Sequence, residues 1–241
     1  MDRKKYVIVM AAGHGTRMGS ELPKQFLSLG GKAILHRTIQ KFIDACPDIT
    51  VVTVLPPDGE YEKWWKEYCI RTNFFCPQII VKGGITRFHS VKSALSKVPD
   101  GALVAVQDGV RPMLSVKMIR TMFSRMSSEP DCRALVPVLP SIDTLKKLVR
   151  DGDGTLVSSG EEVDRSQIFG AQTPQIFRSE DIRAAYSQPY DTLYTDDASV
   201  AERYGIPLTF CEGERLNLKI TSPDDMVLAE AILSAGASRS R

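Results

Sequence analysis

The sequence has no long hydrophobic run and no excess of charge of either sign. Lys and Arg number 31 against 29 for Asp and Glu, a formal net charge of +2, so no overall field favours nucleic acid or an acidic membrane as a partner. The apolar stretch 6–12 near the N-terminus is shorter than a signal-peptide core or a membrane span. We therefore expect a cytoplasmic protein that binds anions only through local clusters of cations.

Cysteine and histidine are scarce, and neither forms a known metal or nucleophile motif. The five cysteines are odd in number and include no C-x-x-C, which favours reduced thiols over a disulfide framework or a zinc site. The three histidines, His14, His36 and His89, form no H-E-x-x-H motif, and the chain has no G-x-S-x-G sequence. Zinc hydrolysis and acyl transfer through a serine triad therefore have little support.

Short apolar runs alternate with amphipathic segments along most of the chain. Because 43% of the residues are hydrophobic and 25% are charged, the composition is that of a globular protein with a substantial core. The alternation predicts one α/β domain over 1–241, Rossmann-like, with a mostly parallel twisted sheet and helices on both faces. The expected strands are 6–11, 49–55, 78–81, 103–106, 134–139 and 208–211, and the expected helices are 34–45, 61–70, 86–95, 116–126 and 223–233.

Residues 140–163 interrupt this alternation and predict a protruding β-arm. Two β-like runs, 144–149 and 155–158, flank an Asp-Gly-Asp-Gly sequence typical of hairpin turns. An isolated hairpin is marginally stable in water, so we expect the arm to pack on the same arm of a second subunit in a homodimer. A calcium loop starting at Asp151 is the alternative, but Leu156 stands where that pattern requires glycine.

The segment after the first expected strand is a candidate polyphosphate site. The residues Ala11-Ala12-Gly13-His14-Gly15 let backbone N–H groups approach an anion closely, and Arg17 and Lys24 add two cations. The loop lacks the Walker A pattern, and Met18 stands where the dinucleotide fingerprint requires glycine. A purely structural strand-to-helix turn is the alternative.

A second glycine pair, Gly83-Gly84, follows the third expected strand. Paired glycines allow a flat ligand to lie against the backbone, and Ser90 or main-chain groups could then hydrogen-bond the edge of a base. The alternative is a plain loop in which Thr86 is the N-cap of the next helix.

Charged and hydroxyl-bearing residues follow the later strands. Asp108 and Arg111 come after the fourth strand, where open parallel sheets bind ligands, and they could contact ribose, a metal ion or phosphate, or form a salt bridge with each other. Thr195 is the expected N-cap of a helix with Asp196 and Asp197 in its first turn. Further downstream, the side chains suited to a phosphomonoester are Arg165, Thr173, Lys219 and Thr221.

Five of these clusters, in this order, resemble the 2-C-methyl-D-erythritol 4-phosphate cytidylyltransferases of the non-mevalonate isoprenoid pathway. They are A-A-G-x-G-x-R-M-G with P-K-Q-F (11–26), G-G-x-x-R-x-x-S-V (83–91), D-x-x-R-P (108–112), V-D-R with A-Q-T-P-Q-x-F (163–177) and L-K-I-T-x-P-x-D (218–225). The resemblance runs from residue 6 to about 231. It implies a nucleotidyltransferase that moves CMP from CTP to the alcohol phosphate, releases pyrophosphate and uses Mg²⁺.

The resemblance also implies roles for individual residues, although it names none that orders the metal. In this family the arm builds the dimer, and Arg165 reaches into the partner's site. The implied catalytic cations are Arg17, Lys24 and Lys219; the CTP contacts are Ala11, Ala12, Gly13, Gly15, Gly83, Gly84, Ser90 and Asp108; and the acceptor-phosphate contacts are Arg111, Arg165, Thr173, Thr195 and Thr221.

Two departures from the usual family pattern leave the acceptor open. Gln107 replaces a common histidine, and Gly109-Val110 replaces two common alanines. The Val110 form also occurs in the related ribitol 5-phosphate cytidylyltransferases, whereas the V-D-R sequence at 163–165 favours methylerythritol. Outside this class, Met18 disfavours a dinucleotide-binding oxidoreductase, and the retention of every cationic position disfavours a nucleotide sensor without turnover.

Overall fold

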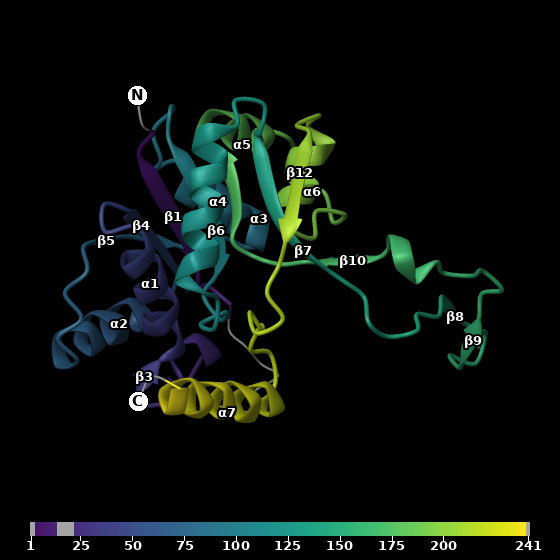
Figure 1. Ribbon diagram of the computed structural model, residues 1–241, viewed down its shortest axis with the longest axis horizontal. Coiled ribbons are helices and arrows are strands. Elements are labelled where there is room, and N and C mark those ends of the chain that lie inside the picture. Colours follow the sequence, from purple (N-terminus) through teal and green to yellow (C-terminus); the bar gives the residue numbers. More distant parts are fainter. Residues whose placement is uncertain (1–2, 14–21, 240–241) are drawn as a thin grey trace.

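The computed structural model of the chain describes residues 3–13 and 22–239. Within these ranges, eight strands form one mostly parallel sheet, with helices on both faces and a long arm that leaves one edge (Figure 1). The strand order is β10-β7-β11-β6-β1-β4-β5, and β12 also pairs with β7. The predicted α/β architecture is confirmed.

The parallel part of the sheet contains all six strands that the apolar runs predicted. Neighbouring strands β6, β1, β4 and β5 run parallel, as do β7 and β12. Their bounds are β1 Lys5–Met10, β4 Thr50–Leu55, β5 Gln78–Lys82, β6 Leu103–Asp108, β7 Ala134–Pro140 and β12 Leu208–Glu212.

Side chains alternate between two cores, one on each face of the sheet. On β1, Val7 and Val9 belong to one buried cluster and Ile8 belongs to the other, as expected for a strand covered on both sides. The first cluster is closed by α1 (Ile34–Ala45), α2 (Glu60–Arg71) and α4 (Val116–Ser128), and the second by α3 (Arg87–Leu95), α5 (Ser179–Ala185) and α6 (Asp197–Arg203).

Several short elements were not predicted. Strand β11 (Gln175–Arg178) is antiparallel to both neighbours and joins β6 to β7, and β10 (Phe169–Ala171) extends the same edge of β7. A small hairpin of β2 (Ser28–Leu29) and β3 (Lys32–Ala33) packs with α7 (Pro223–Arg239), which runs six residues beyond its predicted end. These strands are two to four residues long, too short to show a hydrophobic period.

The arm leaves the sheet after β7 and returns at β10 (Figure 1). Its strands β8 (Leu148–Arg150) and β9 (Leu156–Ser158) pair antiparallel, and Asp151 Oδ1 accepts the backbone N–H groups of Asp153 and Thr155 across the turn. The predicted hairpin turn is thus confirmed. Strand β8 begins at Leu148, whereas the predicted run began at 144. The facing strand β9 ends at Ser158, because Gly160 turns the chain with a φ of 78°, so the residues before Leu148 have no strand to pair with.

A membrane span is not found in the described ranges, where no helix combines the necessary length with the necessary apolar character.

His36 on α1 is buried in an aromatic setting. Its ring stacks on Phe74 at 3.9 Å between centroids, and its Nδ1 lies 3.0 Å from the hydroxyl of Tyr68, which accepts the backbone N–H of Ala33. The imidazole and the hydroxyl are therefore within hydrogen-bond distance inside the core. Burial, assisted by the positive charge of the nearby Lys32, lowers the pKa of His36 to about 4.

We expect the free energy of unfolding to fall with pH between about 6.5 and 4. The unfolded chain binds a proton at His36 near pH 6.5, whereas the folded chain resists it down to about pH 4, so acid favours unfolding by on the order of 2 kcal/mol. Urea titrations at pH 7.5, 6 and 5 measure this loss. In the His36→Gln variant the dependence across this window should shrink, and an unchanged dependence would contradict the assignment.

Candidate active site

A cavity of about 510 Å³ opens at the carboxyl ends of the parallel strands, where open α/β sheets bind ligands. It brings together residues from four segments that are far apart in the sequence. Its lining residues are Met10, Ala12, Gly13, Pro57, Gly84, Ile85, Thr86, Arg87, Ser90 and Asp108. Five of the residues predicted to contact CTP, namely Ala12, Gly13, Gly84, Ser90 and Asp108, therefore line one cavity.

The loops around this cavity are held together through their backbones. The Gly83 N–H donates to the Leu55 carbonyl at 2.7 Å, and the Gly109 N–H donates to the Met10 carbonyl at 2.9 Å. A Cβ at Gly83 would lie 2.5 Å from the Cβ of Ala12, much closer than real Cβ contacts. Gly83 is therefore required where two loops touch, a packing reason that was not predicted from the sequence.

Gln25 fixes the start of the first glycine loop, a role that the sequence analysis missed. Its buried side-chain amide donates to the Ala11 carbonyl at 2.6 Å and to the Gly13 carbonyl at 2.9 Å. Gln25 lies on the short 3-10 helix η2 (Lys24–Phe26), which also carries Lys24. The P-K-Q-F motif was the available signal, but only its lysine had been given a role. Gly15 and Arg17, also predicted in this loop, lie outside the described residues.

The second glycine loop is shaped by Ser90 and Thr86. Thr86 caps α3 by accepting the His89 N–H, as the structural alternative predicted. The Ser90 hydroxyl accepts the Gly84 N–H and donates to the Thr86 carbonyl, both at 2.9 Å. The hydroxyl proton of Ser90 is thus already donated within the loop. Toward a nucleobase, this side chain can therefore only accept a hydrogen bond.

Asp108, at the end of β6, is the centre of a cluster of charges. The Nζ of Lys219 lies 3.0 Å from Asp108 Oδ2, and the Nε of Arg111 lies 3.2 Å from the same oxygen. Arg111 also donates to the Asn217 carbonyl at 2.7 Å. The salt bridge considered from the sequence is therefore present, and Lys219 joins it from a segment more than a hundred residues away.

The charge balance of this cluster favours an anionic ligand. Burial opposes ionisation of Asp108, but the positive charges of Lys219, Arg87 and Arg111 outweigh it and hold the pKa of this carboxyl below its usual value. Arg87 is itself paired with Asp197, so three cations stand against two carboxylates, and one net positive charge remains available. Thr173 lies beside them, since its hydroxyl accepts the Asp108 N–H at 3.0 Å.

The other predicted acceptor residues do not contact this cluster. Thr221 donates to Asp225 Oδ2 at 2.7 Å near the start of α7. Arg165 lies in the arm, on the short helix η3 (Arg165–Gln167), where it donates to the Ile142 carbonyl at 3.0 Å. Thr195 is exposed in the loop before α6.

The predicted start of α6 needs correction. Its N-cap is Asp196, not Thr195: the Asp196 carboxylate accepts the Ser199 N–H at 2.8 Å, and the Ser199 hydroxyl bonds back to the cap. Asp197 has no capping role. It is fully buried and binds Arg87 through both oxygens. The sequence could not distinguish two adjacent aspartates, because the partner of Asp197 lies 110 positions earlier.

The donor set fits a divalent cation only if the substrate supplies most of the ligands. In the part of the chain that the structure describes, no three His, Cys, Asp or Glu side chains gather at one point. Asp108 is the one carboxylate among the described residues that line the cavity. Mg²⁺ commonly binds through one or two carboxylates together with substrate phosphates and water, and this site fits that arrangement.

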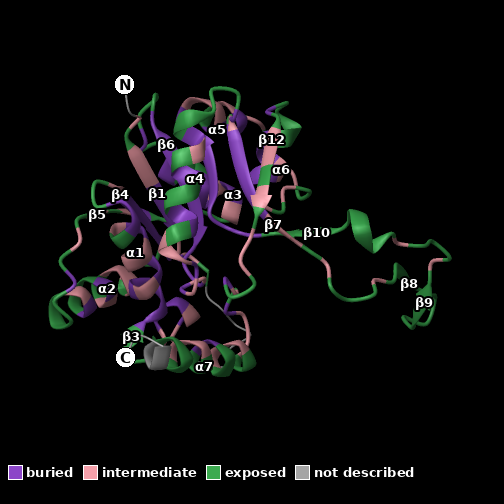
Figure 2. Ribbon diagram, in the orientation of Figure 1, coloured by how far each residue is buried: buried purple, intermediate pink, exposed green. Residues whose placement is uncertain are grey.

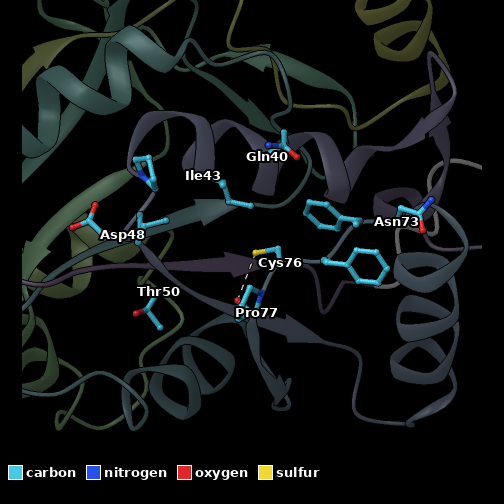
Figure 3. Close-up of a pocket in the computed structure, with 11 residues that line it drawn as sticks. Gln40, Ile43, Asp48, Thr50, Asn73, Cys76 and Pro77 are labelled. Atoms are coloured by element: carbon cyan, nitrogen blue, oxygen red, sulfur yellow. Dashed lines mark hydrogen bonds between the residues drawn. The ribbon is translucent and has the colours of Figure 1, made fainter.

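A separate cleft of about 430 Å³ lies at the amino ends of the parallel strands, opposite the first cavity (Figure 3). It is formed where β4 and β5 begin, at Thr50 and next to Pro77, and its other labelled residues come from α1 and the connections to these strands. None of the predicted site residues lines it. The cleft at the carboxyl ends of the strands is therefore the candidate active site.

Known proteins of one family are similar to this chain over almost its entire length. The family model for 2-C-methyl-D-erythritol 4-phosphate cytidylyltransferase matches residues 6–235. The enzyme of that name from Porphyromonas gingivalis strain W83 is 41% identical over 239 residues, which cover 98% of this chain and 100% of the relative. The corresponding enzyme of Bacteroides thetaiotaomicron is 39% identical over 95% of this chain and 100% of its own length.

A solved structure agrees with these matches. The crystal structure of the Francisella tularensis 2-C-methyl-D-erythritol 4-phosphate cytidylyltransferase superimposes with a TM-score of 0.74 at 29% identity and covers 95% of this chain and 99% of that one. The motifs, the fold and these matches agree, and the chain belongs to the 2-C-methyl-D-erythritol 4-phosphate cytidylyltransferase family.

Proposed function

We propose that this protein transfers CMP from CTP to 2-C-methyl-D-erythritol 4-phosphate and releases pyrophosphate. The observation that carries the proposal is the cluster of Lys219, Arg111 and Asp108 at the rim of a cavity built from both glycine loops. Family membership supports the same reaction.

In this proposal CTP occupies the 510 Å³ cavity. Its cytosine lies against the backbone of Ala12, Gly13 and the 83–84 loop, where glycines permit close approach. The triphosphate is bound by Lys24, together with Arg17. The acceptor phosphate lies beside Arg111, Thr173 and Lys219, which meet around Asp108. Thr195, Thr221 and the partner's Arg165 would complete its site.

The chemical step needs alignment and charge neutralisation. An oxygen of the acceptor phosphate attacks the α-phosphorus of CTP, the new P–O bond forms, and the bond to the β-phosphate oxygen breaks, so that pyrophosphate carries away the electron pair. No general base is required, because the acceptor phosphate is already ionised near neutral pH. Asp108 and the nucleotide phosphates would hold Mg²⁺, which supplies further charge neutralisation.

The arm supports a homodimer in which each protomer completes its partner's site. Four aliphatic side chains of the β8–β9 hairpin are substantially exposed, namely Leu148 at 47%, Val149 at 46%, Leu156 at 56% and Val157 at 38%. Figure 2 shows the arm as almost entirely exposed in one protomer. Aliphatic groups concentrated on a thin hairpin are typical of an interface, because burying them against a second copy removes them from water.

The function is tested by release of pyrophosphate from CTP. We expect release with 2-C-methyl-D-erythritol 4-phosphate and a much lower kcat/KM with ribitol 5-phosphate. A higher kcat/KM for ribitol 5-phosphate would change the acceptor but keep the reaction. Absence of release with both acceptors would overturn the proposed function, and binding of NAD(P)H would then favour an oxidoreductase.

Replacing Lys219 should abolish most of the activity. We expect Lys219→Ala to lower kcat by about 10² to 10³, the usual cost of losing a preorganised charge that stabilises a transition state. The matched control is Lys117→Ala, since Lys117 is an exposed lysine on α4. Steady-state kinetics at saturating CTP measure the difference, and equal activities of the two variants would remove Lys219 from the catalytic role.

The shared site can be tested by mixing two inactive variants. Arg165→Ala and Lys219→Ala homodimers should each be nearly inactive, whereas a heterodimer would contain one intact site if Arg165 acts across the interface. After joint refolding, about half of the randomly paired dimers are heterodimers, and each has one intact site out of two. The mixture should therefore recover about a quarter of the wild-type activity. No recovery in the mixture, with light scattering showing dimers, would place Arg165 outside the partner's site.

A further inference from the structure

Arg87 and Asp197 form a buried ion pair at the edge of the candidate active site. The Nη1 of Arg87 lies 2.9 Å from Asp197 Oδ1, and its Nη2 lies 2.5 Å from Oδ2, so the two planar groups meet in a fork. Asp197 is 0% exposed, and the buried Tyr186 hydroxyl donates to its Oδ1 at 2.6 Å. The orientation of the guanidinium is therefore fixed from behind by a fully enclosed carboxylate.

The opposite side of Arg87 is open to the cavity. Its side chain is 33% exposed, and Arg87 is one of the residues that line the 510 Å³ cavity together with Ala12, Gly13 and Asp108. Its charge also reaches Asp108, since it contributes to lowering the pKa of that carboxyl. Arg87 is thus a cation that faces the proposed nucleotide site, although the roles inferred from the sequence did not include it.

The ion pair joins the two loops that carry the proposed substrate contacts. Arg87 directly follows the second glycine loop and begins α3, whereas Asp197 begins α6, two residues after Thr195. These segments are 110 residues apart in the sequence. A shift of either segment would therefore strain the fork that holds the other.

Aromatic rings reinforce this junction. Phe88 stacks on Tyr186 at 4.7 Å and on Tyr194 at 5.6 Å between centroids, and His89 contacts the ring of Tyr190 at 5.4 Å. The loop before α6 is therefore packed on the first turn of α3. Such a contact transmits the position of one loop to the other.

Stability alone does not account for an ion pair at this place. Burying two charges costs about as much as their attraction returns, and apolar replacements are often at least as stable. A comparable pair, Arg133 with Asp181, links the residue before β7 to α5, and its carboxylate side chain is 14% exposed. Neither residue lines the cavity. The pair of Arg87 and Asp197 differs in two respects: its carboxylate is fully buried, and its arginine lines the cavity.

We propose that Asp197 is a positioning residue of the transfer reaction. Through its fork with Arg87, it holds a guanidinium at the cavity proposed for the nucleotide and keeps the loop of Thr195 in place relative to the second glycine loop. This inference rests on the proposed function. Neither residue donates or accepts a proton in the reaction, and the role of Asp197 is exerted through Arg87.

The first experiment compares Asp197→Asn with the matched control Asp181→Asn. Each substitution removes one carboxylate charge from an Arg–Asp pair without changing its shape. We expect Asp197→Asn to raise KM for both CTP and the acceptor and to lower kcat/KM about 10- to 100-fold, because the released guanidinium loses its fixed orientation. Asp181→Asn should lower the melting temperature but leave kcat and both KM values at wild-type levels.

A second variant covers the case in which Asp197→Asn does not fold. Arg87→Lys keeps the positive charge but cannot form the planar fork, so it should raise the same two KM values. The proposal would be overturned if Asp197→Asn and Arg87→Lys both kept wild-type kinetic constants. It would also be overturned if the control Asp181→Asn lost as much kcat/KM as they do.

A binding measurement separates this proposal from the proposed function. Calorimetry with the α,β-methylene analogue of CTP, which cannot transfer CMP, reports affinity without turnover. In the wild type we expect the analogue to bind more tightly when the acceptor phosphate is present. The coupling factor is the ratio of the Kd of the analogue without the acceptor to its Kd with the acceptor. In Asp197→Asn this ratio should be close to 1. Wild-type protein that binds the analogue but releases no pyrophosphate from CTP would refute the proposed function and, with it, the role of Asp197 in transfer. Unchanged affinity and coupling in Asp197→Asn, with pyrophosphate release by the wild type, would refute the positioning role alone.

Discussion

The candidate site depends on keeping one nearly buried carboxylate ionised. Asp108 ends the central strand β6 and is almost buried, so its charge must be balanced by the protein. Lys219, Arg111 and Arg87 come from three separate segments. Arg111 is also held by the Asn217 carbonyl, and Arg87 is also held by Asp197. The fold therefore gathers more positive charge than Asp108 requires, and the surplus is suited to phosphates.

The framework of the fold was predictable because it follows from local patterns. Each strand predicted from an apolar run is present, and α1 has the predicted bounds, because alternating and helical hydrophobic periods record which faces are buried. The position of the cavity was also predictable, since the loops that follow parallel strands lie together at the carboxyl ends of those strands. The glycine loops and Asp108 meet there, as the order of the motifs indicated.

The contacts that set side-chain roles were not predictable, because their partners are remote in the sequence. Gln25 bonds to carbonyls of the preceding loop, and Asp197 bonds to a guanidinium 110 residues away. A glutamine or an aspartate in a sequence does not indicate which remote group it will bind. Strand β11 was missed for a related reason: its four residues are stabilised by insertion between β6 and β7, which no short sequence window records.

The order of these segments along the chain has a consequence during synthesis. Asp108 emerges from the ribosome long before Lys219, and Ile220, whose N–H donates to the Val110 carbonyl, follows immediately after that lysine. Until these last segments dock, a nascent chain holds its central carboxylate beside arginine alone. The charge balance around Asp108 is thus complete only after the C-terminal segments have been synthesised and have docked on the sheet.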